Sequence, residues 1–156
     1  MRQWREQNGL RSAALVDGKL KLVLNNTLAA VEDGRCAVVE FLGPLDAMVQ
    51  NRLEVVFEEL VANTVRHGFA DDSDQSIHVE VERGSGAITL TFEDDGTPFN
   101  PVQAEAPGRA DADRVGGLGL PLIAKMSSAL RYEQLAPGEL RQGFNPRNRT
   151  TVSVKA

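Results

Sequence analysis

The chain of 156 residues has the length of one ordinary domain, and its 42% hydrophobic content suffices for one continuous core. Its 17 basic and 22 acidic residues give a formal net charge of −5, which argues against a general nucleic-acid binder with a basic face. No run approaches the roughly 20 apolar residues that span a membrane, and the N-terminus lacks the apolar segment of a signal peptide. These features predict a soluble, cytoplasmic protein.

The first part of the chain contains one clear strand. Residues 1–18 mix charges and glycines without a sustained period, and they stay open as a short helix, a flexible arm or a link to something upstream. We therefore treat 1–18 as an unassigned N-terminal arm and 19–156 as the domain. Alternating leucines predict a strand with one buried face: Leu20, Leu22 and Leu24.

An apolar run over 36–42 follows Asp33-Gly34, a dipeptide that favours a turn. The run is too short to be assigned by its period. Cys36 opens it and has no second cysteine for an intramolecular disulfide, as expected in a reducing cytoplasm. Its apolar neighbours predict a buried, structural thiol.

The longest helical pattern of the chain follows Pro44. Its core-facing positions recur at intervals of three and four residues, the signature of an amphipathic helix: Val49, Leu53, Val56, Leu60 and Thr64. Gly68 stands where a C-terminal glycine would end the helix.

Two alternating runs, 77–81 and 88–92, are joined through Gly84-Ser85-Gly86 and predict a β-hairpin. His78, within the first run, is expected to face solvent. Residues 100–115 are rich in Pro, Ala, Gly, Asp and Arg, and predict a loop long enough to serve as a functional lid.

Gly116-Gly117-Leu118-Gly119 opens a second helix, whose predicted apolar face is Leu122, Ile123, Met126 and Leu130. Strands near 130–135 and 150–155 complete the chain. We therefore expect an α+β two-layer sandwich, in which a mixed, largely antiparallel sheet carries its helices on one face.

A polar stripe on the helix after Pro44 holds the first candidate site residues. Glu59, Asn63 and His67 lie four residues apart, so each is about 40° around the helix axis from the last. We expect Asn63 to be at least half buried, and its amide oxygen suits Mg²⁺. Glu59, one turn earlier, could polarise a hydroxyl near that metal. The alternative is a helix end capped by Asn63 or His67, with Glu59 merely solvated.

The second candidate lies where the predicted hairpin ends. Asp94 continues the alternation of the run 88–92, so its carboxylate emerges on the core-facing side of the strand. A carboxylate there must accept hydrogen bonds, and the exocyclic amine of adenine is one suitable donor. Gly96 lets a ring approach the backbone closely. The alternative is an ordinary Asp-Gly turn.

The glycines at 116–119 form the third candidate. Flexible glycines and unpaired N–H groups at a helix N-terminus suit phosphate. The spacing matches neither the Walker nor the Rossmann fingerprint, and a glycine hinge without a ligand is the alternative.

These three constellations occur in a characteristic order. A helix with Glu-x-x-x-Asn, a strand ending in Asp-x-Gly-x-Pro, a lid and Gly-x-Gly before a helix together resemble the ATP-binding domain of the GHKL superfamily, which includes gyrases, histidine kinases and MutL. Three segments resemble the anti-sigma-factor serine kinases in particular: Phe57-Glu58-Glu59-Leu60-Val61-Ala62-Asn63-Thr64-Val65-Arg66-His67-Gly68-Phe69, Asp94-Asp95-Gly96-Thr97-Pro98-Phe99-Asn100-Pro101 and Gly116-Gly117-Leu118-Gly119-Leu120. The resemblance covers roughly residues 19–156.

The resemblance implies ATP and Mg²⁺ as cofactors. It implies that Asn63 ligates Mg²⁺, that Asp94 binds adenine and that Glu59 is the catalytic general base. Other residues at matching positions are candidates to contact the nucleotide: His67, Gly96, Pro98, Arg114, Gly117, Leu118, Gly119 and Thr150. The chain departs from the family's Gly-Thr at the start of the last strand, where it has Arg149-Thr150. Arg114 is the first candidate for the phosphate-binding arginine of the lid, and Arg109 is the other.

The function implied by the resemblance is that of a serine/threonine protein kinase that binds a sigma factor and phosphorylates an anti-anti-sigma (STAS-type) protein. Such kinases are typically homodimers, and we expect neither nucleic acid nor membrane as a direct partner. One alternative is an ATPase or regulatory ATP-binding module without protein-kinase activity. The other is the catalytic domain of a histidine kinase, although neither histidine lies in a phosphoacceptor helix pair.

Overall fold

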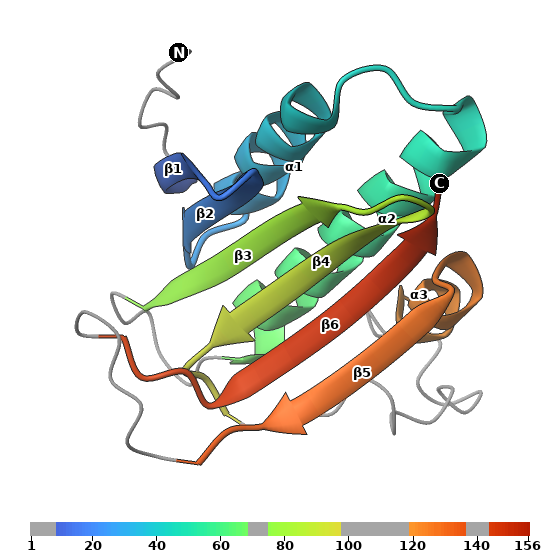
Figure 1. The fold of residues 1–156 in the computed structure, drawn as a ribbon. Helices are drawn as coiled ribbons and strands as arrows, with labels where there is room; N and C mark the ends of the chain where they lie inside the picture. Colours follow the sequence, from blue (N-terminus) through green and yellow to red (C-terminus); the bar gives the residue numbers. More distant parts are fainter. Residues whose placement is uncertain (1–8, 69–74, 98–118, 137–143) are drawn as a thin grey trace.

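A six-stranded sheet forms one layer of the fold, and the helices form the other (Figure 1). The computed structural model describes residues 9–68, 75–97, 119–136 and 144–156. The strands follow the order β1-β2-β3-β4-β6-β5 across the sheet. Their bounds are Leu10–Val16 (β1), Lys19–Asn25 (β2), Ser76–Arg83 (β3), Ala87–Asp94 (β4), Ala129–Gln134 (β5) and Asn148–Lys155 (β6).

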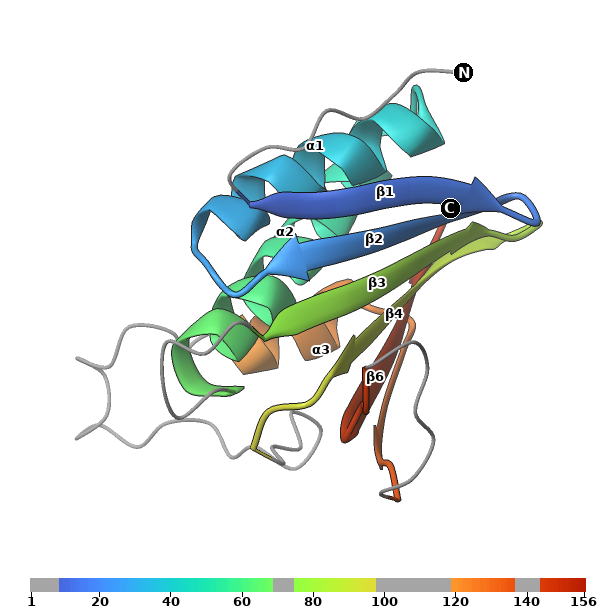
Figure 2. The same cartoon turned by 90° about the vertical axis from the view of Figure 1, so that its left-hand side faces the viewer.

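The helices α1 (Ala29–Leu42), α2 (Ala47–Asn63) and α3 (Gly119–Met126) all cover the same face of the sheet (Figure 2). This confirms the expected two-layer α+β architecture and the hairpin through residues 84–86. Every pairing among the described strands is antiparallel, so the parallel component of the expected mixed sheet does not occur in them. Within the same ranges, no helix is long and apolar enough to cross a membrane.

The stretch 10–16, part of the arm left unassigned above, is the edge strand β1. Its alternation is hard to see because Leu10 alone is buried, while Leu15 is 60% exposed. The turn that joins it to β2 is the signal that could have found it. Asp17 and Gly18 both have positive φ, 52° and 78°, the conformation of a two-residue hairpin turn, for which Asp-Gly is a favoured sequence.

The expected turn at Asp33-Gly34 is wrong, because both residues lie inside α1. Gly34 serves close packing there. A Cβ at this position would lie 2.6 Å from Cζ of Phe57 in α2, so only glycine lets the two helices approach this closely.

The expected burial of Cys36 is also wrong. It lies on the exposed side of α1, with its Sγ 3.5 Å from Oε1 of Glu32. Helix α3 ends at Met126, so Leu130, which we expected on its apolar face, belongs to β5 instead.

Gly34→Ala is expected to lower the free energy of unfolding. The Phe57 ring is fully buried and cannot yield, so overpacking costs about 1–3 kcal/mol, against about 1 kcal/mol returned by helix propensity. Urea unfolding measures the difference. Gly86→Ala is the matched control, because a Cβ at Gly86 meets nothing within 4 Å. Equal stability of the two variants would contradict this role of Gly34.

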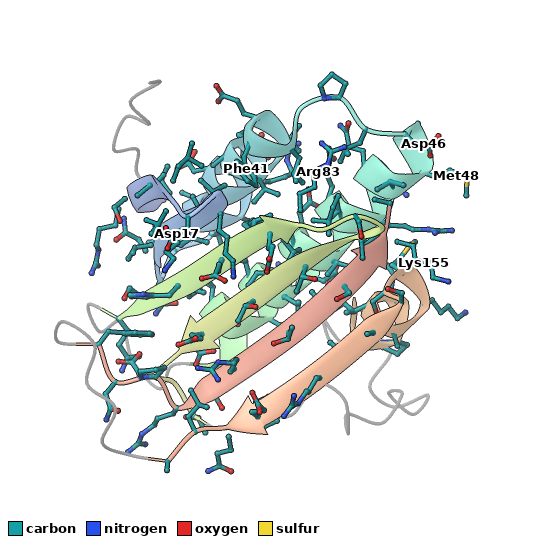
Figure 3. The ribbon with its side chains drawn as sticks, viewed as in Figure 1. Asp17, Phe41, Asp46, Met48, Arg83 and Lys155 are labelled. Atoms are coloured by element: carbon teal, nitrogen blue, oxygen red, sulfur yellow. The ribbon has the colours of Figure 1, made fainter. Side chains whose placement is uncertain are left out.

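Helix α2 runs along the sheet from one end to the other (Figure 1), and its polar stripe of candidate site residues lies towards its C-terminal end. At its start, the Asp46 carboxylate accepts the Met48 N–H at 2.9 Å, an N-terminal cap. Asp46 and Met48 lie at one end of the molecule (Figure 3). Arg83, the last residue of β3, donates from its guanidinium to the Leu42 carbonyl at 2.9 Å. The C-terminus of α2 therefore lies at the opposite end. There the helix widens into a π-helical turn, η1 (Thr64–Gly68), a feature often found at functional sites.

Candidate nucleotide-binding site

Chain segments that are distant in sequence meet at the end of the sheet opposite to the α2 N-terminus. The C-terminal ends of α2 and β4 lie there in both views, with α3 beside α2 (Figures 1 and 2). The rings of Phe57 and Phe92, with centroids 5.8 Å apart, pack α2 onto β4. Each ring lies two residues before a candidate site residue, Glu59 or Asp94, so the apolar core fixes the elements that carry the site.

Asn63 is buried at the end of α2, as expected, with 9% of its surface exposed. Its Nδ2 atom has no hydrogen-bond partner within the described residues. A buried amide group without a hydrogen-bond partner costs stability. Such groups are therefore rare in folded proteins, unless a ligand supplies the missing bond. A half-turn about χ2 would present Oδ1 at the same place, so the position suits a metal-ligating oxygen.

Glu59 lies one helical turn before Asn63 and is partly exposed. Its carboxylate can therefore meet a group that arrives from solvent. His67 lies in η1, and its side chain is outside the described part of the structure.

The Asp94 carboxylate lies at the end of β4 on the helix-covered face, as its alternation predicted. Its Oδ1 accepts the Gly96 N–H at 2.9 Å and Nδ2 of Asn148 at 3.0 Å. Burial raises the pKa of Asp94 above its usual value, with the negative charge of Asp95 adding to this, while the two hydrogen bonds act in the opposite direction. The bond to Gly96 also makes this an Asx turn, so the alternative interpretation as a turn holds as well.

Sequence reasoning missed two residues beside Asp94. Asn148 is 5% exposed, and its amide oxygen accepts a hydrogen bond from the Tyr132 hydroxyl. Its Nδ2 donates to the Gly96 carbonyl at 3.1 Å as well as to Asp94. Both residues lie opposite candidate residues in the ladder, Asn148 beside Asp94 and Tyr132 beside Thr150. For Asn148, the available signal was a polar residue at core-facing parity at the start of the last strand.

Arg149 and Thr150 point to opposite faces of β6, which bears on the departure from Gly-Thr. Thr150 is opposite Phe92 and so shares the helix-covered face. Arg149 lies on the outer face, with Nε 3.1 Å from Glu93 and Nη1 3.6 Å from Glu133. The bulk added by arginine in place of glycine therefore stays away from the face that carries Asp94 and Thr150.

A family model described as a histidine kinase-like ATPase domain matches residues 24–141. The chain belongs to the histidine kinase-like ATPase family. The resemblance to the anti-sigma-factor kinases is also confirmed. The chain is 31% identical over 105 residues to the "Anti-sigma F factor" of Clostridium novyi (strain NT), covering 64% of this chain and 73% of the relative.

A second relative is the "Serine/threonine-protein kinase BtrW" of Bordetella bronchiseptica, 28% identical over 111 residues, with 69% of this chain and 74% of the relative covered. Among solved structures, the chain is similar to the histidine kinase domain from the Erythrobacter litoralis EL346 blue-light activated histidine kinase. That similarity has 17% identity and a TM-score of 0.44, and it covers 84% of this chain. The chain spans 61% of that domain's length.

Several predicted residues of this histidine kinase-like ATPase domain lie outside the described ranges. They are Pro98, Arg109, Arg114, Gly117, Leu118 and the rest of the expected lid over 100–115. Their nucleotide contacts, and the choice between the two arginines, stay predictions. Gly119, the last glycine of this run, is the first residue of α3.

The outer face of the sheet carries a separate hollow of about 1220 Å³, lined largely by polar and charged side chains. His78 lies in it on the outer face, as expected, but its ring stacks on Phe144 with centroids 3.6 Å apart and is therefore only partly exposed. Burial lowers the pKa of His78 below its usual value, while the negative charges of Glu93 and Asp95 act in the opposite direction. Because Asn63 and Asp94 do not line it, this hollow is distinct from the candidate nucleotide site.

Proposed function

We propose that this chain is an ATP-dependent protein serine/threonine kinase of the anti-sigma-factor type. It binds a sigma factor and phosphorylates an anti-anti-sigma protein of the STAS type. One observation carries the proposal: the buried Asn63 amide, whose Nδ2 has no hydrogen-bond partner among the described residues, and the hydrogen-bonded carboxylate of Asp94 lie at the same end of a histidine kinase-like ATPase fold.

Nucleotide binding follows from the chemistry of these groups. Asp94 accepts a hydrogen bond from the exocyclic amine of adenine, and Gly96 leaves room for the ring. Thr150 lines the same face of the sheet. Asn63 holds Mg²⁺ through its amide oxygen. The ion supplies positive charge that neutralises the phosphate oxygens, the main electrostatic requirement of phosphoryl transfer.

Glu59 is the general base of the proposed reaction. It lies one turn from Asn63 on the same stripe of α2 and is partly exposed, so a serine or threonine hydroxyl of a docked protein can reach it. Its carboxylate accepts the hydroxyl proton as the oxygen attacks the terminal phosphorus of ATP, while the bond from that phosphorus to the bridging oxygen breaks and ADP leaves.

The choice of partners rests on relatives rather than on geometry. One relative is named for its action on a sigma factor and the other as a serine/threonine kinase. These names support a sigma factor as a partner and a serine/threonine kinase activity. The STAS-type substrate and the homodimer that we also propose rest on the resemblance to the anti-sigma-factor kinases alone.

Phosphate transfer from radiolabelled Mg-ATP to a STAS-type protein encoded near this chain's gene tests the proposal. The expected product carries acid-stable phosphate on serine or threonine. Acid-labile phosphate would indicate a histidine kinase instead. Binding of Mg-ATP without transfer would favour a regulatory ATP-binding module. If Mg-ATP gives no protection against thermal unfolding, every nucleotide function proposed for this chain fails.

A further inference from the structure

The Asn148 side chain uses all its hydrogen-bonding groups in organising the base end of the site. Its two N–H bonds go to Oδ1 of Asp94 and to the Gly96 carbonyl, at 3.0 and 3.1 Å. The carbonyl of Gly96 can only accept, so the nitrogen must face it, and the amide oxygen then faces the Tyr132 hydroxyl. The partners thus fix the orientation of the amide.

The same contacts restrict the Asp94 carboxylate. The donors from Asn148 and from the Gly96 N–H both approach Oδ1, one from the neighbouring strand β6 and one from the turn after β4. A carboxylate held from two directions cannot rotate freely, and donors favour its ionised form. Asn148 is only 5% exposed, so water does not replace its amide as a donor to Asp94.

We propose that Asn148 and Tyr132 are positioning residues that hold Asp94 as a fixed acceptor and thereby select adenine over guanine nucleotides. This rests on the proposed function, because it assumes that Asp94 faces the base. The remaining oxygen, Oδ2, is assigned to the base. At position 6 of the purine ring, adenine carries an amine, which donates a hydrogen bond to the carboxylate. Guanine carries a carbonyl at the same position, and the carboxylate repels it.

Tyr132 acts through Asn148. Its hydroxyl donates to the amide oxygen, which prevents the amide from turning its oxygen towards Asp94. Without the hydroxyl, the buried oxygen of Asn148 loses its donor, and the reversed amide would set two acceptors against each other. The structure therefore predicts a graded effect: a large loss on changing Asn148 and a smaller one on changing Tyr132.

Titration of full-length wild type, Asn148→Leu and Tyr132→Phe with Mg-ATP and with Mg-GTP measures this selection. We expect wild type to prefer ATP. Asn148→Leu should bind ATP roughly ten- to hundredfold more weakly, and its ratio of ATP to GTP affinity should fall by about tenfold or more. In Tyr132→Phe the ratio of ATP to GTP affinity should fall by a smaller factor. Thr151→Val is the matched control, since residue 151 lies on the outer face of β6 and should keep the ratio.

The outcomes separate the two proposals. Wild type that binds neither nucleotide overturns the proposed function and this inference with it. Wild type that prefers ATP, with both variants keeping the same ratio, overturns only the inference. Tighter ATP binding by Asn148→Leu would also overturn it, because the amide would then occupy the place of the base. If Asn148→Leu does not fold, the ratio measured for Tyr132→Phe decides.

Discussion

Asp94→Asn is expected to weaken Mg-ATP binding by roughly a hundredfold while leaving the protein folded. The substitution keeps the shape of the side chain but removes the charge that accepts the adenine amine, and it introduces an amide nitrogen that can face that amine. Isothermal titration with Mg-ATP measures the loss. Asp95→Asn is the matched control, because Asp95 follows Asp94 directly but lines the hollow on the outer face. Equal losses in both variants would contradict the assignment.

The same variant makes a prediction about stability and pH. Because burial raises the pKa of Asp94 in the folded state, the folded protein binds a proton there more readily than the unfolded chain. Ionisation of Asp94 therefore costs stability, which falls as the pH rises from the usual carboxyl pKa through the raised one. At neutral pH Asp94→Asn should be at least as stable as wild type, and this difference should vanish in acid. A clearly less stable variant at neutral pH would indicate a structural role.

Glu59→Gln is expected to reduce phosphate transfer to the partner protein by roughly a hundredfold to ten-thousandfold, with Mg-ATP binding unchanged. The amide keeps the size of the side chain but cannot take the proton of the attacking hydroxyl. Single-turnover transfer of labelled phosphate, measured beside ATP titration, separates the chemical step from binding.

Glu58→Gln is the control for this substitution. Glu58 is adjacent, but its carboxylate is directed to Arg35 of α1, at 3.6 Å, rather than along the stripe that carries Asn63. Transfer should be normal in Glu58→Gln. If Glu59→Gln transfers phosphate at the wild-type rate, Glu59 is not the base, although the nucleotide site is unaffected by that result.

The parts of the fold that the sequence predicted are those with a strong, repeated pattern. The 3.6-residue period of α2 and the alternation of β3 and β4 each involve many buried side chains, so local pattern and tertiary burial agree. The failures have a different cause. Gly34 is a glycine because Phe57 from another helix needs the space, and a close approach between distant segments leaves no local signal.

The residues of the candidate site also fall into those that the sequence predicted and those that it did not. Asn63 and Asp94 were found because they end strongly patterned elements in a recognisable order. Asn148 and Tyr132 were not found, because their importance comes from pairing across β4, β6 and β5, and strand order across a sheet cannot be deduced from adjacent sequence. The meaning of Arg149-Thr150 likewise required the structure, which places the two side chains on opposite faces.

Amide NMR spectra recorded during titration with Mg-ATP test most directly whether this end of the sheet binds the nucleotide. The side-chain NH₂ signals of Asn63 and Asn148 and the backbone N–H of Gly96 are the reporters. We predict that all three shift, while residues of the outer face such as Arg149 and Thr151 move little. Shifts confined to the outer face, or no shifts at saturating Mg-ATP, would contradict the assignment of this site.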